Sequence, residues 1–122
     1  MKRVYSFSKE DLKEVKDLIS FDPYAQNLPI EKIEEMKKND ELFDVIFVRQ
    51  GVEIREGKEF GKTYEYLLVV DAPLNFFEKA EKKLARIKSL KRLKKEEEEE
   101  IAKKIEDQAE KAEKGFGAIF GE

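Results

Sequence analysis

The side chains with the clearest potential for binding chemistry are the basic residues between Lys79 and Lys95. Nine lysines and arginines lie in this stretch, against one acidic residue, Glu81. Contact with phosphates requires such side chains on one accessible face. At helical spacing, four of them point the same way and are the candidate nucleic-acid-binding residues: Lys79, Lys82, Lys83 and Arg86.

Other charges nearby oppose this interpretation. Lys88, Arg92 and Lys95 point to nearly the opposite side of a helix, and five glutamates follow directly at positions 96–100. The net charge of the chain is −3, so no overall positive field attracts nucleic acid. A solvated helix with salt bridges between neighbouring turns is the stronger interpretation, and nucleic-acid binding is the alternative function.

Catalytic chemistry has few residues on which to rest. The chain has no histidine and no cysteine, which excludes the usual proton shuttle, thiol nucleophiles and Cys/His zinc sites. Asp44, Glu53 and Glu65 could be imagined as a magnesium cluster, but Asp44 and Glu53 lie far apart on the same expected strand. We therefore predict a protein that is not an enzyme, with no metal and no cofactor.

The periodicity of apolar residues predicts the elements that carry these side chains. Residues 2–7 are expected to form a strand and residues 9–20 a helix, and a second helix starts at Pro29. Residues 42–71 alternate as a hairpin whose turn is at Gly61. In the expected register Arg55 lies opposite Glu65 and Arg49 opposite Asp71, which pairs opposite charges. The predicted fold class is α+β in the order β-α-α-β-β-α, a small antiparallel sheet with helices on one face and a long C-terminal helix.

The C-terminal helix is predicted from two apolar segments that share one phase. No Gly or Pro interrupts the chain between Pro73 and Gly115. The stripe is Phe76, Phe77, Ala80, Leu84 and Ile87, and then Ile101, Ile105, Ala109 and Ala112. One continuous helix of about 40 residues would be about 60 Å long and would extend beyond its own core. The alternative is a break near Glu96–Glu98 that folds the last helix back onto the core.

A helix that extends beyond its core leaves apolar side chains that need a partner. The predicted function is therefore a non-catalytic protein-interaction or oligomerisation module, most simply a homodimer through the distal helix. The segment Gly115–Glu122 carries further apolar residues and is expected to dock on this protein or on another. The candidate protein-binding residues are Ile101, Ile105, Ala109, Phe116, Ile119 and Phe120.

Composition sets the remaining expectations. Charged residues make up 43% of the chain, mostly Lys and Glu, which is typical of proteins from hyperthermophiles. No apolar run reaches the length of a membrane span and no signal peptide is evident, so a cytoplasmic location without membrane contact is expected. We expect three parts: an α+β core (1–93), a charged distal helix (94–114) and a Gly/Phe tail (115–122).

Overall fold

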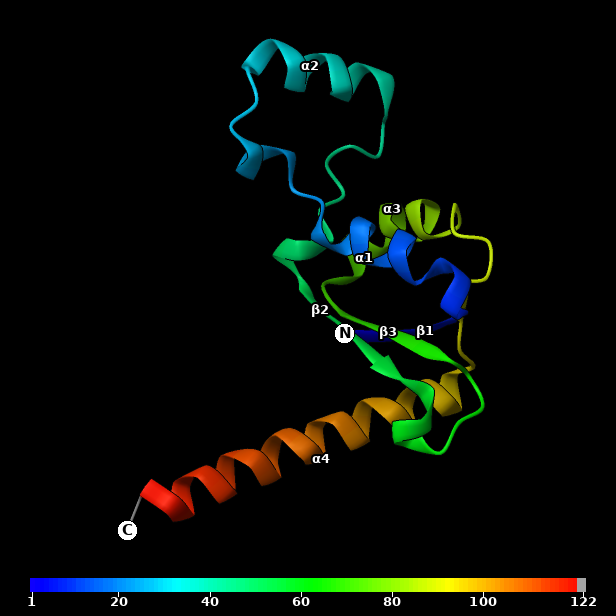
Figure 1. Cartoon of the computed structure of the whole chain (residues 1–122), viewed down its shortest axis with the longest axis vertical. Helices are drawn as coiled ribbons and strands as arrows, with labels where there is room; N and C mark the ends of the chain where they lie inside the picture. The colour runs from blue at the N-terminus through cyan, green and yellow to red at the C-terminus, as the bar shows by residue number, and fades with distance from the viewer. Residues whose placement is uncertain (121–122) are drawn as a thin grey trace.

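The computed structural model describes the backbone of residues 1–120 and the side chains of residues 1–111. The strands are β1 (Lys2–Phe7), β2 (Gly51–Glu56), β3 (Tyr66–Asp71) and β4 (Lys91–Arg92), and the α-helices are α1 (Leu12–Ser20), α2 (Ile30–Asn39), α3 (Leu74–Leu84) and α4 (Lys95–Phe120). Short 3₁₀ helices are η1 (Lys9–Asp11), η2 (Pro23–Gln26), η3 (Phe47–Arg49) and η4 (Gly57–Phe60). The strands form an antiparallel sheet in the order β2-β3-β1-β4. The fold is therefore α+β with a long C-terminal helix, as the sequence predicts (Figure 1).

Helices lie on both faces of this sheet. On one face α1 and α3 pack over side chains such as Tyr5, Leu68 and Val70. On the other face α4 packs over Val4, Leu67 and Val69. The sequence placed helices on one face only. In β3 four consecutive residues, 67–70, are buried. A strand with both faces covered is expected to have such a continuous apolar run.

The expected continuous C-terminal helix is wrong, because the chain turns between α3 and α4. The connection covers residues 85–94, directly before the considered break near Glu96–Glu98, and β4 within it pairs Arg92 with Tyr5. Leu90 packs into the core on the α1–α3 face, whereas Leu93 is buried on the α4 face. The helix α3 ends at Leu84, before both leucines, and β4 lies between them as an edge strand, so the two leucines reach opposite faces of the sheet.

The hairpin also differs from its expected length and register. Its first strand starts at Gly51, because the preceding residues 45–47 are all buried and do not alternate as a half-exposed strand would. Arg55 lies opposite Leu67 instead of Glu65, and Gly51 lies opposite Asp71. The turn of the hairpin is longer than expected because it contains η4, which is followed by Gly61. Gly61 has φ +69°, the positive φ expected there. Gly57 approaches the segment before β3 so closely that a Cβ would lie 1.8 Å from the carbonyl oxygen of Tyr64.

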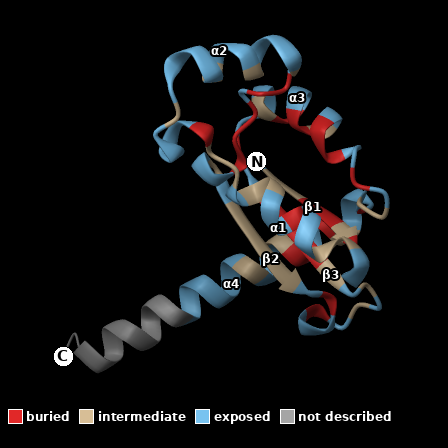
Figure 2. Ribbon diagram, turned by 45° about the horizontal axis from the view of Figure 1, so that its top comes forward, coloured by how far each residue is buried: buried red, intermediate tan, exposed pale blue. Residues whose placement is uncertain are grey.

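The helix α2 stands apart from the layers around the sheet. It contains no buried residue. Figures 1 and 2 show it above α1 and α3, joined to the body by two loops, with almost its whole surface exposed. This separation leaves space between α2 and the two helices below it.

Candidate functional site

A cleft of about 530 Å³ lies between α1, α2 and α3. Small-molecule sites in proteins have volumes of roughly 300–1,000 Å³ and mainly apolar walls. The lining residues come from all three helices and from the loops that flank α2: Glu14, Asp17, Leu18, Phe21, Met36, Asn39, Asp40, Phe43, Lys83, Arg86 and Ile87. We call this space the α2 cleft.

The apolar part of the α2 cleft is built on the main core. Leu18 of α1 and Ile87 after α3 belong to the core on the α1–α3 face, so their positions are fixed by packing. Phe21 and Phe43 meet edge to face with ring centroids 6.2 Å apart, at the two points where the chain leaves for α2 and returns from it. Met36 contributes the apolar side of α2. A long, flexible methionine can adapt to different apolar surfaces.

Lys83 supplies a buried positive charge in the wall of the α2 cleft. Its exposed fraction is 8%, and its Nζ donates a hydrogen bond of 3.0 Å to the carbonyl oxygen of Val45. The same Nζ lies 4.8 Å from the centroid of the Phe21 ring, within the range of a cation–π contact. Burial lowers the pKa of Lys83, and the nearby carboxylate of Asp40 opposes this change.

A second polar pair, Asp40 and Arg86, closes one end of the α2 cleft. The guanidinium of Arg86 donates two hydrogen bonds, 3.1 and 3.2 Å long, to the two carboxylate oxygens of Asp40. Asp40 also accepts a hydrogen bond from the backbone of Leu42, and these bonds together hold its pKa below the usual range. Asp40 directly follows α2, so this pair joins the end of α2 to the segment after α3.

The opposite wall of the α2 cleft is acidic. Glu14 and Asp17 lie on the exposed side of α1, and neither forms a salt bridge with a residue among positions 1–111. The cleft therefore has a cationic wall on the α3 side, an anionic wall on the α1 side and apolar surfaces between them. Such an arrangement can hold an apolar body and can orient one polar end of it.

The predicted nucleic-acid-binding residues do not share one accessible surface. Lys79 and Lys82 are exposed on α3, but Lys83 is buried against Val45 and Phe21. The guanidinium of Arg86 is bound to Asp40. Two of the four predicted side chains thus line the α2 cleft.

The predicted protein-binding residues fall into three groups. Ile101 is fully buried, with 0% exposure, and Ile105 is half-buried beside it, so the sheet of the same chain covers both. The expectation that Ile101 needs a second molecule to cover it therefore loses its basis. Ala109 is exposed. The side chains of Phe116, Ile119 and Phe120 lie outside the described residues.

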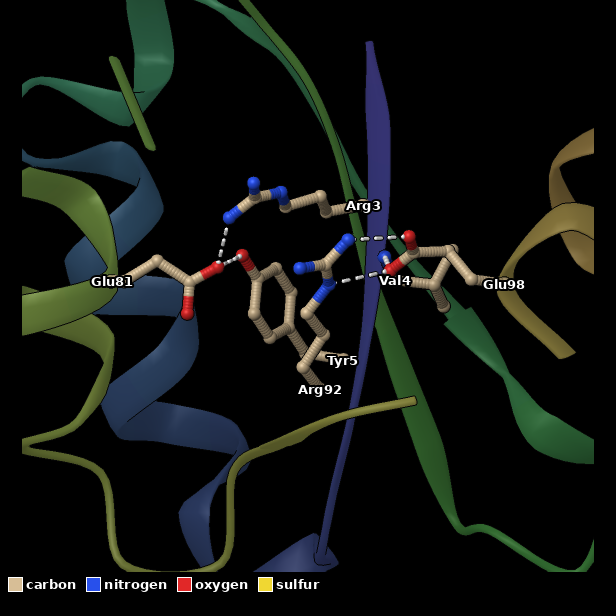
Figure 3. A network of polar contacts seen from close by, with 6 residues as sticks. All are labelled: Arg3, Val4, Tyr5, Glu81, Arg92 and Glu98. Carbon is tan, nitrogen blue, oxygen red and sulfur yellow. Dashed lines mark hydrogen bonds and ion pairs between the residues drawn. The ribbon is translucent and has the colours of Figure 1, made fainter. Parts of the chain in front are cut away.

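A buried network of charged groups holds α4 and α3 to β1 (Figure 3). Glu98, which is 6% exposed, accepts hydrogen bonds from the backbone N–H of Val4 (2.9 Å) and from the guanidinium of Arg92 (2.8 and 3.1 Å). On the other side of β1, Glu81 accepts hydrogen bonds from Tyr5 (2.7 Å) and Arg3 (2.6 Å). Both oxygens of Glu98 and one oxygen of Glu81 accept hydrogen bonds from the chain itself, which indicates a structural role.

The apolar residues of the α2 cleft were missed by the sequence analysis. Phe21, Phe43 and Ile87 come from three separate segments, and nothing in their spacing shows that they converge. One signal was available, because the apolar face of α2, with Ile30, Ile33 and Met36, is narrow. A narrow face indicates a helix that is not fully packed into a core.

Neither a metal site nor a membrane span is found in the part of the chain that the structure describes. No group of three or more carboxylates is placed there to bind a metal ion, and no described helix combines the length and the apolar character needed to cross a bilayer. Comparison of the chain with protein-family models, with curated proteins and with solved structures gave no match. Function is therefore argued from the geometry of the α2 cleft.

Proposed function

We propose that this protein is a non-catalytic binding module whose α2 cleft takes up a small, mainly apolar molecule. The single observation that carries the proposal is the cleft of about 530 Å³ beneath a helix that has no buried residue. A helix that serves only to complete a core would bury its apolar face. Here Ile30 is 72% exposed, and Met36 faces a space large enough for a ligand.

The polar groups of the cleft support binding more than catalysis. Lys83 is held by a backbone carbonyl and an aromatic ring, and Arg86 is held by Asp40. Both side chains are therefore fixed in position, as groups that orient a ligand must be. A general base in contact with a nucleophile, which most hydrolytic mechanisms require, is not among the groups that line the cleft.

Binding of Nile red, a neutral dye that fluoresces in apolar surroundings, tests this proposal. We expect saturable binding to the wild-type protein and a loss of about tenfold or more in affinity for Met36→Glu, because a carboxylate would then point into the apolar space. Because α2 contributes no buried residue, this substitution leaves the core intact, and circular dichroism should show unchanged helix content.

Ile30→Glu is the matched control for Met36→Glu. It places the same charge on the same helix, but Ile30 does not line the α2 cleft. Its affinity for Nile red should equal that of the wild-type protein. Equal losses in the two variants, or no saturable binding to the wild-type protein, would contradict the proposal.

Self-association is a second proposal, carried by the distal part of α4. This helix crosses the sheet and continues past β2, where Gln108 accepts a hydrogen bond of 2.5 Å from Arg55, and residues 106–111 are all exposed (Figure 1). We propose that two copies associate through this part of α4, including Ala109. Sedimentation velocity at micromolar concentration tests it, and a monomer at all concentrations would refute it.

A further inference from the structure

The positive charge of Lys83 has no acidic partner in the described part of the chain. Its nearest acidic neighbour along the cleft wall, Asp40, gives both carboxylate oxygens to Arg86. The ammonium has three N–H donors, and one of them is used by Val45. A buried charge is normally paired, because its removal from water is costly. Lys83 therefore presents an unneutralised cation beside an apolar space.

From this geometry we infer that the α2 cleft binds amphipathic carboxylates, with the alkyl or aromatic body between Phe21, Phe43 and Met36 and the carboxylate at Lys83. This inference rests on the proposed binding function and specifies the chemical class of the ligand. The carboxylate would accept hydrogen bonds from the free donors of Lys83. A charge-assisted hydrogen bond of this kind is about twice as strong as one between neutral groups.

The charges around the cleft also fix the direction of the ligand. The α1 wall carries Glu14 and Asp17, which repel an anionic group. On the α3 wall the charge of Arg86 is paired with Asp40, so Lys83 is the cation that attracts the anionic group there. The anionic end is therefore directed to the α3 side. A ligand with a cationic end would be drawn to the α1 wall instead and would leave Lys83 buried and unpaired.

A cleft of about 530 Å³ has room for a chain of about ten carbons. Each buried methylene contributes about 0.8 kcal/mol, so a ten-carbon chain gains enough from burial to bind without its polar end. The alkyl chain and the polar end can therefore be tested separately.

The test compares three ligands that share one chain: decanoate, 1-decanol and decylamine. Their affinities are measured by displacement of Nile red from the full chain, below the concentrations at which the amphiphiles form micelles. We expect decanoate to bind about tenfold more tightly than decanol, and decylamine to bind no more tightly than decanol. Lys83→Met should remove the preference for decanoate, measured as the ratio of the affinities for decanoate and decanol.

Two further variants exclude a general effect of charge or of folding. Lys82→Met removes an exposed lysine from the same helix outside the cleft and should keep the wild-type order of affinities. Lys83→Arg keeps the charge and should keep the preference for decanoate. A thermal melt of each variant shows that it is folded at the temperature of measurement.

The outcomes separate this inference from the proposed function. If decanol and Nile red bind but decanoate has no advantage, or if its advantage survives Lys83→Met, the inference is wrong and the apolar site remains. If decylamine binds most tightly, the acidic α1 wall selects the ligand and the inference is wrong. If none of the three amphiphiles and no dye bind, the proposed function fails as well.

Discussion

The helices α4 and α2 differ in how they are attached to the rest of the fold. α4 buries Ile101 fully, engages Glu98 with two elements and crosses from β1 to β2. α2 buries no residue, and its described ion pairs to other segments lie at its C-terminal end: Asp40 with Arg86, and Lys37 with Asp44. Both helices are rich in charge, yet only α4 is part of the stable core.

This difference separates stability from binding within one small domain. The free energy that holds the fold comes from the layers around the sheet. The segment that bounds the cleft contributes little to it, so α2 can move or adapt without loss of the core. Segments that bind ligands commonly belong to the least stable parts of a protein.

Truncation of an isoleucine in each helix should give the largest contrast. Ile101→Ala removes three carbons from a fully buried site and should lower the free energy of unfolding by about 2–5 kcal/mol. Ile33→Ala, on the partly exposed face of α2, should lower it by less than about 1 kcal/mol. Guanidinium denaturation of the two variants measures both values, and similar losses would show that α2 is as much a part of the core as α4.

Removal of the carboxylate at position 98 should have the next largest effect. Glu98→Ala leaves the N–H of Val4 without its partner and releases Arg92, at a cost of about 1–3 kcal/mol. Glu99→Ala, one residue along the same helix and exposed, is the control and should change stability by about 0.5 kcal/mol at most. The same denaturation experiment compares them. Equal effects would mean that the buried network contributes nothing beyond a surface charge.

Release of the end of α2 should change its mobility without changing global stability. Asp40→Asn removes the charge that binds Arg86, so limited trypsin digestion at Lys37 and Lys38 should become faster while the melting temperature stays nearly constant. Asp17→Asn, at the rim of the same cleft but without a salt bridge in the described residues, should digest like the wild-type protein. A large fall in melting temperature for Asp40→Asn would place α2 within the cooperative core.

Lowering the pH should have the smallest effect and should act on the same ion pair, Asp40 with Arg86. The hydrogen bonds from Arg86 lower the pKa of Asp40. The ion pair therefore contributes its full stabilisation above the ordinary aspartate pKa of about 4, and this stabilisation is lost as pH falls through the lowered pKa. Amide exchange in α2, corrected for its intrinsic pH dependence, should therefore accelerate below about pH 4. In Asp40→Asn this additional acceleration should be absent.

The elements near the N-terminus could be predicted from the sequence because local pattern decides them. Residues 2–7 form β1 as expected, and helical spacing located α1 and α2 to within a few residues. The positive φ at Gly61 followed from turn chemistry. In each case the residues that determine the element lie within it.

The turn after α3 could not be predicted, because the residues that cause it act over long range. Nothing between Ala85 and Lys94 breaks a helix by itself. Ile101 and Ile105 match the helical phase of the apolar stripe in α3 only because the connection happens to have the length that keeps this phase. Leu90 and Leu93 lie beside the stripe and were the only local sign of a change. Their destinations, on opposite faces of the sheet, depend on β1 and β3.

The candidate site could not be predicted from the sequence for the same reason. The sequence predicts Lys83 and Arg86 on one face of a solvated helix, with phosphate contact as the alternative. Lys83 is buried beside Phe21, and Arg86 is bound to Asp40. Phe21 and Asp40 both come from segments more than 40 residues earlier in the chain. Helical spacing predicts the direction of a side chain but not what covers it.

The contact between α4 and β1 also sets an order in which this protein can be completed during synthesis. Glu98 and Val4 are 94 positions apart, so β1 is synthesised well before the helix that covers it. Until Ile101 has left the ribosome, the surface formed by Val4, Leu67 and Val69 lacks the cover that α4 provides. A nascent chain that stops before this point presents an apolar sheet face to its surroundings, which favours aggregation or capture by a chaperone.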